Sequence, residues 1–240
     1  DEIGDLSRSI SLMLQNLGQY TRYLERLPNT LAHEMHNPLN VVNSSLENFE
    51  LTHQELVNNE YLGRARNGIL RLRNILTSLT EAANLKDGLE SEKEQTERFD
   101  LATLVSGCVD GYQSIHKNYR IIYETPSQAV PIDGSPDHIA QMLDKLVDNA
   151  VAFGRTGGDV VVRVRREGQT ARLSVVNWGS TLPADITNRL FEPMVSSSKD
   201  ARRSHLGLGL YIARIIAEFH GGTVNASNRK ANDGVEVIVS

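Results

Sequence analysis

The sequence predicts two domains of different fold class: an all-α antiparallel helical hairpin, completed as a dimeric four-helix bundle, and then an α/β sandwich. Three observations lead to this interpretation. Apolar residues recur at steps of three and four from Ile3 to Phe49, a second stripe with the same spacing runs from Leu62 to Ala83, and short strand-like and helix-like runs follow it. The period of the hydrophobic pattern changes along the chain, so the class of domain changes as well.

The first stripe predicts one long helix. Its spacing places the apolar side chains on one helical face, and a stripe of this length with few caps is typical of a coiled coil or bundle. Pro28 and Pro38 lie within it. Each lacks a backbone N–H donor, so we expect a kink or a loosened turn at these positions.

The second stripe predicts a partner helix. A polar stretch, residues 52–59, separates the two stripes, and the simplest arrangement is an antiparallel hairpin. Two helices enclose little core, so we expect a homodimer to complete the bundle.

The remainder of the chain predicts a layer of helices on one mostly antiparallel sheet. It follows a charged, glutamate-rich segment, residues 86–97, which we interpret as a linker. Residues 178–206 show no clear period, and a loop of that length in a compact domain is usually functional. Strands are expected at Arg120–Glu124, Val160–Arg166, Arg172–Val176 and Val235–Val239, and helices at Leu101–His116, Asp137–Phe153 and Leu208–Phe219.

Composition narrows the class of protein. The chain has 240 residues and a net charge of −5 without a basic block, which argues against nucleic acid as a partner. Its one cysteine, Cys108, fits a reducing compartment. No apolar run is long enough to cross a bilayer, and the chain starts at Asp1 without a methionine. We therefore expect a piece of a longer chain, linked to a membrane only through an upstream segment absent here.

His33 is the first candidate functional residue. It is two residues from both Leu31 and Met35, so it points away from the apolar stripe, with Glu34 beside it and Asn37 one turn further on. A neutral imidazole held by a carboxylate is a capable nucleophile toward phosphorus.

The run "LAHEMHNPLNVV" at residues 31–42 resembles the phosphoacceptor H-box of sensor histidine kinases. The resemblance implies that His33 accepts phosphate, that Glu34 acts as base or hydrogen-bond acceptor, and that Asn37 positions a water during dephosphorylation of a partner. His36 stands where the family commonly has Arg, and we interpret it as a surface residue because His33 is the one that precedes the acid.

Three further segments resemble, in the family's order, the N, F and G2 boxes of its ATP-binding domain. In the N-box-like run "LDKLVDNAVAF" the resemblance implies that Asn149 ligates Mg²⁺, that Lys145 and Asp148 contact phosphate and metal-bound water, and that Phe153 stacks on adenine. A neutral oxygen ligand suits a hard cation that keeps several waters. Ala152 stands where the family commonly has Lys.

The G1-like run "VVNWGSTLP" departs most from the family. Asn177 replaces the usual Asp that accepts a hydrogen bond from adenine, and Thr181 replaces a glycine. An amide oxygen accepts the same bond without charge. Gly179 and Leu182 complete the predicted nucleotide contacts of this run.

The two remaining boxes supply the phosphate side of the site. "RLFEPMVSSSK" resembles the F-box, which implies that Phe191 is the hinge of an ATP lid and that Lys199 faces phosphate. "HLGLGLYIARIIAEFHGG" resembles the G2 box, and helix-start amides favour phosphate. The implied contacts are the backbone groups of Gly207, Leu208, Gly209 and Leu210, and we expect His220 to cap the end of this helix.

The resemblance divides the chain into residues 1–19 (the end of a HAMP signalling helix), 20–90 (the dimerisation and phosphotransfer hairpin), 91–98 (a linker) and 99–240 (an ATP-binding domain of the histidine-kinase/Hsp90-like type). It implies Mg²⁺- and ATP-dependent phosphorylation of His33 and transfer to an Asp of a response regulator receiver domain, with phosphatase activity. It also implies that the chain is the cytoplasmic portion of a bacterial inner-membrane protein. Three alternatives stay open: a phosphatase-dominant or nucleotide-gated signalling protein, a gyrase-like or Hsp90-like ATPase, and a structural coiled coil.

Overall fold

The computed structural model describes residues 2–56, 59–91, 96–184, 186–195 and 207–240. The chain divides into two compact units, Asp1–Leu85 and Lys86–Ser240. Each unit is described by itself below.

The first unit is built from two long helices. Helix α1 spans Glu2–Thr52, continuous through both prolines, a short 3-10 turn (η1) covers Gln54–Leu56, and α2 spans Glu60–Ser91. Hydrogen bonds between side chains join Asn29 to Asn84 at 2.8 Å and Asn40 to Arg73 at 2.7 Å, and Arg66 forms an ion pair with Glu50. Residues that come later in α1 are bonded to residues that come earlier in α2. The two helices therefore run antiparallel, as the sequence predicts.

The described residues of the polar stretch, 52–56 and 59, lie at the facing ends of the two helices. The rings of Phe49 and His53 stack with centroids 4.5 Å apart at the end of α1. Asn59 then caps α2, since its Oδ1 accepts the backbone N–H of Tyr61 at 2.9 Å.

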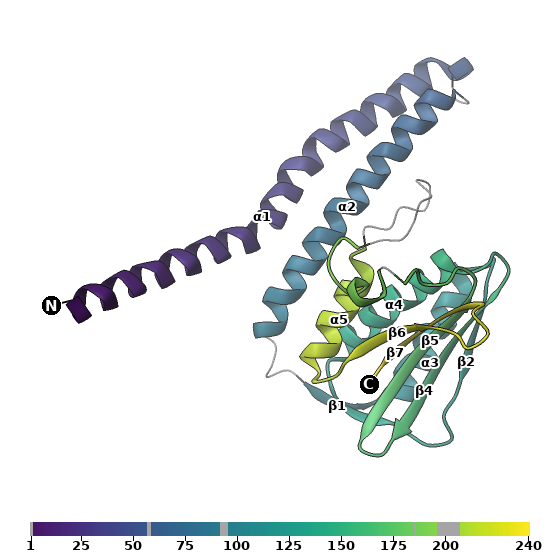
Figure 1. The fold of residues 1–240 in the computed structure, drawn as a ribbon. Coiled ribbons are helices and arrows are strands. Elements are labelled where there is room, and N and C mark those ends of the chain that lie inside the picture. Colours follow the sequence, from purple (N-terminus) through teal and green to yellow (C-terminus); the bar gives the residue numbers. More distant parts are fainter. Residues whose placement is uncertain (1, 57–58, 92–95, 185, 196–206) are drawn as a thin grey trace. The chain divides into compact units, whose positions relative to one another are not determined.

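The second unit combines a five-stranded sheet, a two-stranded ribbon and three α-helices (Figure 1). The ribbon pairs β1 with β3, and the sheet has the order β2-β4-β5-β7-β6. β2 and β4 are parallel and every other neighbouring pair is antiparallel, which confirms the mostly antiparallel sheet. The elements are β1 (Glu97–Asp100), α3 (Leu101–Ile115), β2 (Arg120–Glu124), β3 (Pro131–Gly134), α4 (Pro136–Phe153), β4 (Asp159–Glu167), β5 (Thr170–Trp178), a second 3-10 turn η2 (Thr187–Arg189), α5 (Gly209–Phe219), β6 (Val224–Asn228) and β7 (Gly234–Val239).

The core of this unit lies between the sheet and the helices. Val160, Val162 and Val164 alternate along β4 and are all at most 1% exposed. They share this core with Leu143, Leu146 and Val147 of α4 and with Ile212 and Ile216 of α5, which are equally buried.

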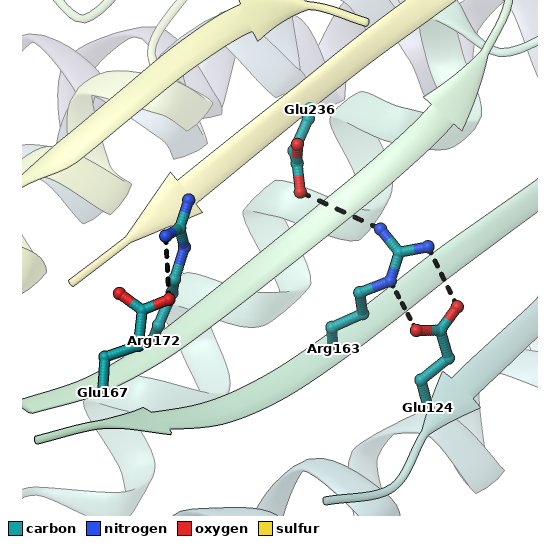
Figure 2. A network of polar contacts seen from close by, with 5 residues as sticks. All are labelled: Glu124, Arg163, Glu167, Arg172 and Glu236. Carbon is teal, nitrogen blue, oxygen red and sulfur yellow. Dashed lines mark hydrogen bonds and ion pairs between the residues drawn. The ribbon is translucent and has the colours of Figure 1, made fainter.

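The opposite face of the sheet carries a network of charged side chains (Figure 2). Arg163 donates to both carboxylate oxygens of Glu124, at 2.6 and 2.9 Å, and approaches Glu236 at 3.9 Å, while Arg172 pairs with Glu167 at 2.9 Å. The Arg163 guanidinium lowers the pKa of Glu124. Period-two alternation thus explains why β4 is apolar on one face and charged on the other.

Side chains also fix the helix ends. Asp100 accepts the Thr103 hydroxyl at 2.6 Å and the Val130 N–H at 2.7 Å, and these bonds lower the pKa of its carboxyl group. His220 caps α5 as predicted, because its Nδ1 lies 2.7 Å from the Ile216 carbonyl oxygen. Among the described residues, no helix is apolar enough over a sufficient length to cross a membrane.

Candidate functional site

The predicted phosphoacceptor segment lies in the middle of α1. His33, Glu34 and Asn37 are exposed, His36 is half-buried, and Ala32 on the opposite side is only 4% exposed. The outward direction predicted for His33 is therefore confirmed. Its imidazole is open to a reacting group on another domain or protein.

The apolar stripe around His33 is incompletely covered within one chain. Leu31 and Met35 are 52% and 46% exposed, whereas Ile69 and Leu76 of α2 are buried. Two helices bury one part of the stripes and leave another part open, which is the expected condition of half a four-helix bundle.

The nucleotide candidates on α4 lie along one face of that helix. Lys145, Asn149 and Phe153 are spaced four residues apart, and all three are half-buried. A Cβ added at Gly209 would lie 3.9 Å from Cβ of Lys145, so the start of α5 lies against this face. The fourth candidate, Asp148, is exposed, and its carboxylate oxygen lies 3.7 Å from Nε2 of His116, which follows α3 directly.

The G1-like run lies against the C-terminal end of α4. The backbone N–H of Arg155 donates to the Trp178 carbonyl at 2.7 Å, and that of Ser180 donates to the Phe153 carbonyl at 3.2 Å. A Cβ at Gly179 would lie 2.5 Å from the Phe153 oxygen. Only glycine permits this close approach, which places Gly179 beside Phe153.

The end of this run is held by the side chain of Asn228, which the sequence did not predict as part of the site. Asn228 of β6 accepts the Leu182 N–H at 2.7 Å and donates to the Leu182 carbonyl at 3.1 Å, so both backbone groups are satisfied by one amide. The N–H of Gly179 also donates to the Asp233 carbonyl at 2.9 Å. Thr181 lies between these two attachment points and is half-buried.

The phosphate side of the site is described only in part. Phe191 is half-buried in a short segment after η2, and Lys199 lies outside the described residues. Gly207 adopts a φ of +68°, and its position against the Val195 backbone leaves no room for a side chain.

The start of α5 offers backbone groups to a ligand. Leu208 and Leu210 are 3% and 8% exposed, so their side chains belong to the core and only their backbones remain for binding. No side chain among the described residues caps this N-terminus. Free N–H groups and the positive end of the helix dipole favour an anion at this place.

The side-chain oxygen that α4 offers is compatible with Mg²⁺. No described group of three or more His, Cys, Asp or Glu side chains is arranged to hold a metal. Mg²⁺ does not require such a cage, because it keeps several waters and takes one or two protein oxygens together with phosphate oxygens. The half-buried Asn149 amide supplies one such oxygen.

These features define an ATPase domain of a known class. Residues 134–240 match the family described as "Histidine kinase-, DNA gyrase B-, and HSP90-like ATPase". The catalytic domain of the histidine kinase ThkA has a similar structure, with a TM-score of 0.53 and 26% identity over 60% of this chain and 93% of that one. The second unit is therefore similar in sequence and in fold to the ATPase domains of this family.

The similarity extends into the helical unit. The sensor protein ChvG of Rhizobium meliloti (strain 1021) is 26% identical over 98% of this chain and 42% of its own length. ThkA in complex with the response regulator TrrA is 25% identical, with a TM-score of 0.58 over 89% of this chain and 60% of that one. The chain is thus similar to sensor histidine kinases over nearly its whole length, and it spans less than half of ChvG.

Proposed function

We propose that this chain is the kinase core of a sensor histidine kinase, which phosphorylates His33 from ATP and passes the phosphate to an Asp of a response regulator. The observation that carries the proposal is the outward-facing His33–Glu34 pair in a chain that also contains the ATPase domain. An ATPase of the gyrase or Hsp90 type has no need of such a helix, and a structural coiled coil has no need of the ATPase domain.

The chemistry needs positioning more than covalent help from the protein. A ring nitrogen of His33 attacks the γ-phosphorus of ATP, the bond from that phosphorus to the β–γ bridging oxygen breaks, and ADP leaves. Glu34 accepts the proton that the imidazole loses. When bound at Asn149, Mg²⁺ neutralises charge on the phosphate oxygens, and Lys145 lies one turn away on the same face.

Contacts for the rest of the nucleotide come from the elements that meet at the end of α4. Phe153 offers a ring for stacking on adenine. The edge of the base is contacted by Asn177, Gly179, Thr181 and Leu182. The amides of Gly207–Leu210 hold the phosphates. Phe191 and Lys199 complete the proposed site as the hinge and a cation of the lid.

A homodimer and a response regulator are the proposed partners. The described hairpin leaves many large apolar side chains uncovered, which supports a second copy as the missing half of a bundle: Leu31, Met35, Val41, Val42, Phe49, Leu70 and Leu72 are each more than 40% exposed. The complex of ThkA with the response regulator TrrA supports docking of a receiver domain. We propose that this surface comprises α1 beyond His33, near residues 40–47, and the early part of α2.

Removal of phosphate from the regulator is the second proposed activity. Asn37 lies one turn beyond His33 and is exposed, so its amide can orient a water toward a phosphoaspartate docked there.

Incubation of the full chain with Mg-ATP and a γ-phosphate label tests the proposal. We expect an acid-labile phosphoprotein that His33→Gln abolishes and that the matched control His36→Gln retains. Label that persists in His33→Gln would refute the acceptor assignment. Label transfer from the phosphorylated chain to a receiver domain, lost when its acceptor Asp is replaced, tests the second step.

A further inference from the structure

The side-chain amide of Asn177 is buried without a partner for its nitrogen. Asn177 is 4% exposed, and Nδ2 has no hydrogen-bond partner among the described residues. It lies on the helix-facing side of β5, where its neighbours across the sheet are Val160 and Val235. A buried amide nitrogen without a hydrogen-bond partner costs free energy in the native state. We therefore expect a ligand to bring a hydrogen-bond acceptor to this place.

The position of Asn177 links that donor to the nucleotide site. The residues directly after it, Trp178–Ser180, are hydrogen-bonded to the last turn of α4 and the residues that follow it, at 2.7 and 3.2 Å. That turn presents Phe153, and Asn149 lies one turn earlier on the same face. A base stacked on Phe153 would therefore present its edge toward the end of β5.

An amide and a carboxylate read a base edge differently. A carboxylate only accepts hydrogen bonds, whereas an amide carries a donor beside an acceptor. Adenine offers the complementary pair, because its N6 amino group donates next to a ring nitrogen that accepts. Paired with both groups, the Asn177 amide would leave neither of its atoms unsatisfied.

We propose that Asn177 recognises adenine at two points, with Oδ1 accepting from the N6 amino group and Nδ2 donating to a flanking ring nitrogen, N1 or N7. This inference rests on the proposed ATP-dependent function. It makes Asn177 a specificity-determining residue whose donor, absent from a carboxylate, contributes directly to affinity.

The test replaces single atoms of the ligand. Affinities of the full chain for ATP, 1-deaza-ATP and 7-deaza-ATP are measured by titration calorimetry. Each analogue keeps the N6 amino group and exchanges one ring nitrogen for C–H. One analogue is expected to bind on the order of tenfold more weakly than ATP, because the buried donor is again unpaired, and which one it is identifies the nitrogen.

A pair of variants assigns the effect to Asn177. In Asn177→Asp, ATP should bind more weakly and the ratio between ATP and the sensitive analogue should fall to about one, since the donor is gone. Asn225→Asp adds the same charge at an exposed position of β6 and should leave the ratio unchanged.

Two outcomes overturn the inference in different ways. Equal binding of ATP and both analogues to the unaltered chain would refute the two-point contact and leave the proposed function standing. No binding of ATP at all would remove the proposed function and this inference together.

Discussion

His220 joins the end of α5 to the start of α4, and its removal is expected to destabilise the ATPase unit. Nε2 accepts the backbone N–H of Ser135 at 3.0 Å, while Nδ1 lies 2.7 Å from the Ile216 carbonyl and donates to it. The two bonds require the neutral ring with its proton on Nδ1. His220→Ala leaves the Ser135 N–H without this partner, which costs about 1–3 kcal/mol of unfolding free energy.

The same contact predicts a pH dependence. Burial, and to a smaller extent His138, lower the pKa of His220 below its ordinary value. Its contribution to stability is therefore complete above the unfolded pKa, about 6.5, and is lost as the pH falls, because the unfolded chain then binds a proton that the native ring resists. At pH 5.5 the loss is at most about 1.4 kcal/mol.

Urea unfolding at pH 7.5 and 5.5 measures both effects. Trp178 is the single tryptophan and lies in the second unit, so its fluorescence follows that unit alone. The unaltered chain should lose more stability on acidification than His220→Ala, and Asn225→Ala should behave as the unaltered chain does. Equal losses in the unaltered chain and His220→Ala would refute the proposed role of the neutral ring.

Three further predictions concern the site and the hairpin. Asn228→Ala removes both hydrogen bonds to the Leu182 backbone, so ATP must order this loop when it binds. The Kd for ATP, measured by calorimetry, should rise about 3- to 10-fold. An unchanged Kd would show that the hydrogen bonds from Asn228 have no part in binding. Gly179→Ala forces a Cβ against the Phe153 carbonyl, and we expect loss of ATP binding with a lowered Tm; normal affinity would contradict the close approach. Leu72→Glu places a charge on the exposed apolar face of α2, and sedimentation should show a shift from dimer to monomer; an unshifted dimer would place the interface elsewhere.

Strong local patterns made most of the fold predictable. The alternation of Val160, Val162 and Val164 identified β4, and the helical spacing of Leu143, Leu146 and Val147 identified α4. The ribbon β1–β3 and the strand β6 were missed. β1 and β3 have four residues each, and β6 is a short edge strand whose exposed positions are polar. None of these three strands is long and apolar enough to be recognised from its sequence alone.

The site was predictable where function depends on local sequence. The helical spacing predicts the exposure of His33, which the structure confirms, whereas its role as acceptor is inferred from the resemblance of residues 31–42 to an H-box and stays a prediction. Asn228 could not be found in this way, because it acts on the backbone of Leu182, 46 residues earlier, and no local pattern records that contact. Periodicity also does not tell which side chains of a stripe are covered within the chain, and Leu31 and Met35 of the stripe are exposed.

The central claim is that ATP delivers its γ-phosphate to the imidazole of His33. Fragmentation mass spectrometry of the chain after incubation with Mg-ATP, with digestion at neutral pH to preserve a phosphoramidate, locates the phosphate within the peptide that contains both His33 and His36. The account predicts phosphate on His33 and none on His36, with the signal lost in Asn149→Ala. Phosphate on His36, or an undiminished signal on His33 in Asn149→Ala, would contradict it.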